Sequence, residues 1–161
     1  MEQQPHETFL RRAITLGRQV ALEEKIAGPF GAVIVRDGAI VGEGQARSEP
    51  EHDPTWHAEI AAIRDACRRL KTTDLSGCTL YTSCECCAMC HAACWRARVS
   101  RIYYAGSAED TETYTGRNHV RPRGQFVLPD ADRNLPMQQL LRDEMLEVWR
   151  AYQALAGASP L

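Results

Sequence analysis

Two short stretches of this sequence carry side chains that can bind a metal ion and move protons. The first is Trp56-His57-Ala58-Glu59, and the second, about thirty residues later, runs from Cys84 to Cys90. Cys87 and Cys90 have the C-x-x-C spacing, which on a helix places both thiols on one face, where they can bind one metal ion. With His57 as a third ligand, a tetrahedral zinc keeps one position open for water, as in catalytic zinc sites.

Glu59 stands two residues after the candidate ligand His57. A carboxylate beside a metal-bound water can take the water's proton and deliver it to a leaving group. The pattern therefore predicts one Zn²⁺ per chain, bound by His57, Cys87 and Cys90, with Glu59 as the catalytic residue.

The cysteine pattern is also compatible with other chemistries. A C-x-x-C motif alone is also typical of structural zinc half-sites and redox pairs. A structural zinc held by four cysteines needs a second, well-separated pair, whereas Cys67 and Cys78 have ten residues between them. Five cysteines lie within residues 84–94, but neither common ferredoxin spacing occurs. The catalytic zinc is favoured, with structural zinc and redox chemistry as alternatives.

The combination H-x-E and C-x-x-C resembles the signature of zinc nucleobase deaminases. The sequence is similar to the cytidine and deoxycytidylate deaminase superfamily, and within it to the guanine deaminase branch. The similarity runs from about residue 8 to residue 106 and is carried by Gly28–Val35, His57–Glu59 and Leu80–Glu85. Cys86 stands where the motif has proline, which leaves Cys84, Cys86 or Cys87 as the possible first ligand. Spacing favours Cys87.

The resemblance implies a fold, a cofactor and a reaction. The fold is a three-layer α/β/α sandwich of the cytidine deaminase type, with one zinc per chain held by His57, Cys87 and Cys90, and the proteins commonly form homodimers. The implied reaction is hydrolytic deamination, in which zinc-activated water attacks an amidine-like ring carbon. Glu59 protonates the ring nitrogen and ammonia leaves.

The resemblance also implies contacts to the substrate ring. Phe30 corresponds to an aromatic residue that packs against the ring, and the Ala58 N–H and the Ser83 carbonyl correspond to groups that hold it. The family usually has a base-binding Asn where this chain has Ala46. The substitute contacts that we expect come from Arg47 and from a polar lid segment containing Asp110, Asn118 and His119. Guanine is the family-level substrate, and another aminopurine, a pterin, an aminopyrimidine or an aminotriazine would suit the same groups.

The order of apolar segments predicts the elements that position these residues. Helical spacing covers 7–26, an apolar strand spans 32–35, and Asp37-Gly38 turns it into a hairpin with 39–41. Further expected elements are a helix to about 70 that carries His57 and Glu59 in its first turn, a strand over 78–82, a helix from about 87 and a strand over 101–105. A mixed, mostly parallel sheet of about five strands within one domain, 1–161, follows.

The rest of the chain and its composition limit the function. Residues 109–119 form the polar lid candidate. Residues 137–155 have the spacing of an amphipathic helix, and we expect this helix to pack on the core of its own chain, with a subunit contact as the second choice. A net charge of −2 makes nucleic acid an unlikely partner, and no apolar run is long enough for a membrane helix. Seven cysteines without an apolar N-terminal segment predict a reducing compartment, the cytoplasm.

Two other functions are alternatives to the small-molecule deaminase. A zinc-stabilised binding domain without catalysis is disfavoured by Glu59, since a closed structural site needs no adjacent carboxylate. A tRNA adenosine deaminase is disfavoured by the acidic charge balance and by Ala46.

Overall fold

The computed structural model describes residues 3–116, 124, 126–129, 132, 134–135 and 137–156. It divides into two compact units, 1–122 and 123–161. The helices of the first unit are α1 (Gln3–Arg18), the π-helical turn η1 (Gln19–Glu23), α2 (Ala58–Leu70), α3 (Ala88–Arg96) and α4 (Ala108–Thr115). Its strands are β1 (Gly31–Arg36), β2 (Ala39–Gln45), β3 (Thr79–Cys84) and β4 (Arg101–Gly106). The second unit contains α6 (Arg142–Ala156).

The strands form one mixed sheet in the order β2-β1-β3-β4. β1 pairs antiparallel with β2 and with β3, whereas β3 pairs parallel with β4 through the predicted β-α-β connection. The predicted hairpin is confirmed, and both Asp37 and Gly38 have the positive φ of a tight hairpin turn. The prediction of a mostly parallel sheet of about five strands needs correction. The described residues contain four strands, and only β3–β4 is a parallel pair, because β1 runs opposite to its two neighbours.

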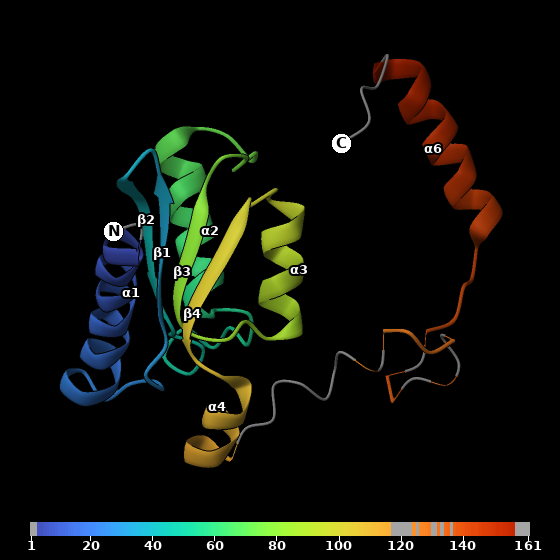
Figure 1. Cartoon of the computed structure of the whole chain (residues 1–161). Coiled ribbons are helices and arrows are strands. Elements are labelled where there is room, and N and C mark those ends of the chain that lie inside the picture. Colours follow the sequence, from blue (N-terminus) through green and yellow to red (C-terminus); the bar gives the residue numbers. More distant parts are fainter. Residues whose placement is uncertain are drawn as a thin grey trace. The chain divides into compact units, whose positions relative to one another are not determined.

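The sheet has helices on both faces, as the sandwich prediction requires (Figure 1). β1 shows why, since its successive side chains point to opposite faces and are buried on both. Ala32 and Ile34 join the core that includes residues of α2 and α3, while Val33 and Val35 join a second core with Leu16 of α1. The three-layer α/β/α architecture is therefore confirmed.

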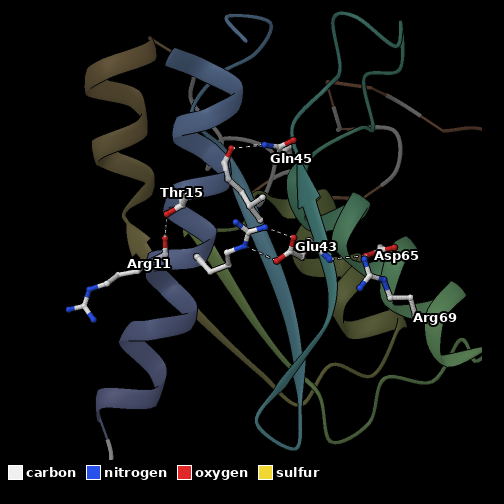
Figure 2. Close-up of polar contacts among 8 residues, drawn as sticks. Arg11, Thr15, Glu43, Gln45, Asp65 and Arg69 are labelled. Atoms are coloured by element: carbon white, nitrogen blue, oxygen red, sulfur yellow. Dashed lines mark hydrogen bonds and ion pairs between the residues drawn. The ribbon is translucent and has the colours of Figure 1, made fainter. Parts of the chain in front are cut away.

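Polar contacts hold the edge strand β2 between α1 and α2 (Figure 2). Arg12 of α1 donates two hydrogen bonds of 2.7 Å to the carboxylate of Glu43. The backbone N–H of Glu43 donates to Asp65 of α2 at 3.0 Å, and Asp65 pairs with Arg69 at 2.8 Å. Because Asp65 accepts a backbone N–H of this edge strand, the contact covers a group that another strand could otherwise pair with.

Two helical segments differ from their predictions. The helix expected over 7–26 begins at Gln3 and ends in the π-helical turn at Glu23. The polar segment expected as a lid forms helix α4 over its first part, because Ser107 and Asp110 build a reciprocal capping box at the helix start. Among the residues that the structure describes, no helix combines the length and apolarity needed to cross a membrane.

The predicted C-terminal helix is present as α6, which begins at Arg142 rather than near residue 137. Acidic residues occupy its first turn, where their negative charge interacts favourably with the positive end of the helix dipole. Trp149 and Tyr152 contact each other edge to face, with ring centroids 6.2 Å apart. Trp149 and Tyr152, two residues of the predicted apolar face, therefore lie side by side on this helix.

Candidate functional site

The sheet topology brings several chain segments to one end of the sheet. β2 ends where β1 begins, with Gln45 opposite Gly31, and β3 and β4 end together at Cys84 and Gly106. Helices α2 and α3 both start at this end, after the ends of β2 and β3 respectively. The residues that precede β1, follow β2 and begin both helices consequently surround one region.

The three predicted metal ligands lie together at the helix starts. His57 and Cys87 are the N-cap residues of α2 and α3, and Cys90 lies one turn into α3. The His57 Nδ1 atom is 3.6 Å from Cys87 Sγ and 3.5 Å from Cys90 Sγ. A tetrahedral zinc with ordinary Zn–N and Zn–S bonds would separate such donors by about 3.6 Å. The donor set and its spacing therefore fit Zn²⁺.

The two thiols differ sharply in acidity. The hydrogen bond from Cys90 lowers the pKa of Cys87 to about 3, and His57 adds to this effect, against the opposing cost of burial. The same contact raises the pKa of Cys90, and burial raises it further. Binding of a divalent metal ion would displace the protons that remain on these thiols, because thiolates are the form that binds the metal.

Glu59 lies directly beside this group. It is buried, and its carboxylate accepts hydrogen bonds of 3.4 Å from the Cys90 thiol and from the Thr82 hydroxyl. Burial raises the pKa of the Glu59 carboxyl above its usual range. A raised pKa favours the protonated form, so this carboxyl takes up a proton more readily than an exposed glutamate, as a proton carrier requires.

A pocket opens over these residues. Of the predicted site residues it is lined by Phe30, His57, Glu59 and Cys87. Cys84 and Ala46 also line it. The polar pocket residues that were not predicted as site residues from the sequence are Ser48, Glu49, Glu85 and Thr111. The first two lie in the loop that joins β2 to the α2 start, and this position between two site elements was the available signal.

Other predicted substrate contacts are not brought to the pocket. Arg47 donates to Glu24 at 2.8 Å and lines a separate groove beside Trp56. Asp110 caps α4 through Ser107, and Thr111 is the α4 residue that reaches the pocket lining.

The remaining predicted contacts lie near the site or outside the described residues. Ala58 is the buried first residue of α2. The Ser83 hydroxyl donates to the Pro29 carbonyl at 3.0 Å and accepts the Gly31 N–H at 3.1 Å, which fixes the chain just before and after Phe30. Asn118 and His119 lie outside the described residues.

The start of α2 is positioned by a glycine of β2, and this leads to a prediction. A Cβ atom on Gly44 would overlap the backbone of Ala58 and Ala62. Gly44→Ala should therefore displace the α2 start, lower the free energy of unfolding by about 1–3 kcal/mol and reduce zinc content, measured by thermal unfolding and elemental analysis. Gly106→Ala is the control, because its Cβ would meet only ordinary contacts of 3.6 Å. Equal stability of the two variants would contradict this prediction.

Known proteins are similar to this chain in sequence and in structure. The family model of the cytidine and deoxycytidylate deaminase zinc-binding region matches residues 3–106. Guanine deaminase from Bacillus subtilis is 42% identical over 152 residues, which cover 94% of this chain and 96% of that protein. Its crystal structure has a TM-score of 0.88 and 40% identity, and the match covers 96% of this chain and 98% of the other.

Two more distant relatives show the range of the similarity. A solved structure in complex with 2,6-diaminopurine is 28% identical with a TM-score of 0.67, over 97% of this chain and 85% of that chain. A tRNA-specific adenosine deaminase from Aquifex aeolicus is 39% identical over 99 residues, 62% of this chain and 64% of that protein. Because the family model spans the elements that carry His57, Glu59, Cys87 and Cys90, the chain belongs to the cytidine and deoxycytidylate deaminase family of zinc-binding proteins.

Proposed function

We propose that this protein is a zinc-dependent hydrolytic deaminase of a small amino-substituted heterocycle, and that guanine is the first substrate to test. The observation that carries the proposal is a buried carboxyl, Glu59, placed between three zinc-binding side chains and a pocket lined by Phe30. Similarity to the Bacillus subtilis guanine deaminase over nearly the whole chain supports the choice of substrate.

The residues present have distinct tasks in this reaction. His57, Cys87 and Cys90 would hold Zn²⁺, and the bound ion would supply an activated water. Glu59 would accept one proton of the attacking water and pass it to the ring nitrogen. It would then pass the second proton, from the hydroxyl added to the ring carbon, to the amino group, so that the C–N bond breaks, a carbonyl forms and ammonia leaves. Phe30 offers an aromatic face to the planar ring. The roles of Ala58, Ser83, Arg47, Asp110, Asn118 and His119 in holding the ring stay predictions.

The test is ammonia release from a panel of compounds by the zinc-loaded protein. Free purines, aminopyrimidines, pterins and aminotriazines should include at least one substrate whose product carries oxygen in place of an amino group. The corresponding nucleosides and nucleotides serve as comparison. Absence of ammonia from every free heterocycle would contradict the proposal.

A tRNA adenosine deaminase is the second candidate, favoured by the 39% identity to the Aquifex aeolicus enzyme. That similarity covers 62% of this chain, whereas the guanine deaminase similarity covers 94%. An RNA substrate bound through Z phosphates would show affinity that falls with salt at a log-log slope near −0.7Z. Steeply salt-dependent deamination of a tRNA stem-loop, without activity on any free base, would favour this candidate.

We infer that the protein is a homodimer. Trp95 on α3 is 79% exposed and Trp149 on α6 is 56% exposed, and aromatic residues of this kind are enriched in protein interfaces. Light scattering should give twice the 18.0 kDa mass of the chain. A single 18.0 kDa species at micromolar concentration would contradict the inference.

We also infer that residues 1–161 act as one deaminase domain in the cytoplasm. The single-domain proposal is supported by similarity to one guanine deaminase along 94% of the chain. The location is supported by seven cysteines, all of them free thiols, since thiols stay reduced in the cytoplasm.

A further inference from the structure

Thr82 lies in the interior of the sheet and contacts the predicted proton carrier directly. Its strand, β3, has neighbours on both sides, and Thr82 is paired with Ala32 of β1 and with Tyr104 of β4. The side chain is buried, and its hydroxyl donates to Oε1 of Glu59 at 3.4 Å. A β-branched side chain on a central strand has little freedom to rotate, so this hydroxyl is a fixed donor.

The other oxygen of the Glu59 carboxylate has a different partner. Oε2 accepts from the Cys90 thiol at 3.4 Å, and the backbone N–H of Glu59 also contacts the carboxylate. Cys90 binds a metal ion as a thiolate, which has no proton to donate. The Thr82 hydroxyl keeps its proton under the same conditions. Oε1 therefore stays held from the sheet, while Oε2, the oxygen beside the metal ligands, becomes available for proton transfer.

We propose that Thr82 is a positioning residue for the deamination reaction, because its hydroxyl holds Oε1 of Glu59 and leaves Oε2 to exchange protons with the reacting water. Thr82 is not among the described residues that line the pocket, so it acts on the substrate through Glu59. The 3.4 Å distance is long for two oxygens, as is common for catalytic contacts before substrate binds. This inference rests on the proposed deaminase function and adds a residue to its machinery.

A purely structural role of the same contact predicts a different result. A buried hydroxyl and a buried carboxylate each need a hydrogen-bond partner, and satisfying them stabilises the fold whether or not a reaction takes place. Loss of a structural contact would lower the melting temperature and leave kcat unchanged. Loss of a positioning contact lowers kcat and leaves KM unchanged, because the pocket lining that binds the ring is the same.

The first test is Thr82→Val, which replaces the hydroxyl by a methyl group of similar size and keeps a residue that favours strands. In the zinc-loaded protein kcat should fall about tenfold at unchanged KM, since a hydrogen bond to a charged group is lost. Thr82→Ser keeps the hydroxyl and should restore most of the lost activity. Thr79→Val is the matched control, because Thr79 lies at the opposite end of β3, and it should retain wild-type kcat. Wild-type kcat in Thr82→Val, or an equal loss in Thr82→Ser, would overturn the inference.

A double substitution tests whether Thr82 acts through Glu59. In the Glu59→Gln protein the hydroxyl has no carboxylate to position, so adding Thr82→Val should leave the residual kcat unchanged. A further loss of the size seen in Thr82→Val alone would show that Thr82 acts on another group, which would also overturn the inference.

Infrared difference spectroscopy tests the contact without turnover. The carboxyl stretching band of Glu59 is the difference between a protein and its Glu59→Gln counterpart. This band should shift in Thr82→Val and return in Thr82→Ser, because its frequency depends on the hydrogen bonds that the carboxyl accepts. A shifted band without ammonia release by the wild type would count against the proposed deaminase, whereas ammonia release with an unshifted band would count against the role of Thr82 alone.

Discussion

Replacing Glu59 by Gln should lower kcat by a factor of about 10² to 10⁴ while the protein keeps its zinc and its fold. Glutamine is nearly isosteric with glutamate, so it can fill the buried position between Thr82 and Cys90. Its amide cannot accept and return a proton, and Glu59 is the pocket carboxylate that is found in contact with a predicted metal ligand, Cys90. Steady-state kinetics and elemental analysis of the same preparation measure both quantities.

The matched control is Glu109→Gln, which changes a carboxylate on the exposed first turn of α4. Its kcat should equal that of the wild type, because Glu109 is not among the residues found to line the pocket. Wild-type kcat in Glu59→Gln would assign the proton transfer to another group, with the pocket carboxylates Glu49 and Glu85 as the next candidates.

Replacing His57, Cys87 or Cys90 by Ala should remove the zinc and with it essentially all activity. Each residue supplies one of the three donor atoms, which lie within 4.8 Å of one another. Two ligands and water hold zinc far more weakly than three, since each protein ligand lost removes a bond to the metal. Elemental analysis should give about one zinc per wild-type chain and almost none in these variants.

Two other cysteines test the choice of ligands. Cys94→Ala removes a buried thiol further along α3, and Cys86→Pro introduces the residue that the motif usually has. Both variants should retain zinc. Loss of zinc in Cys86→Pro together with full zinc in Cys87→Ala would show that the first cysteine ligand is Cys86.

The residues that the sequence alone determined are those whose chemistry depends on short intervals. His57 and Glu59 are two residues apart, and Cys87 and Cys90 share one helical turn, so local geometry fixes each pair once a helix starts there. The burial of the sheet on both faces could also be predicted, because the uninterrupted apolar run of β1 requires apolar neighbours on each face.

The tertiary structure decided which distant residues share the pocket. Thr111 reaches it because β4 ends beside β3, and Ser48 and Glu49 reach it because β2 ends beside the start of β1. The spacing of residues along the chain does not specify which strand ends meet, so these residues could not be selected from the polar segments around them.

Arg47 was predicted from the sequence as a substrate contact, but in the structure it does not line the pocket. Because it follows Ala46, it was predicted as a substitute base contact. Its guanidinium instead pairs with Glu24, which precedes β1 in the chain. An arginine side chain is long, so it can pair with a carboxylate that is distant in the sequence but close in space. The packing of the η1 end beside the loop after β2 decides which carboxylate that is. The short intervals in the sequence thus predicted the reaction chemistry, and the tertiary structure decided which charged side chains line the pocket.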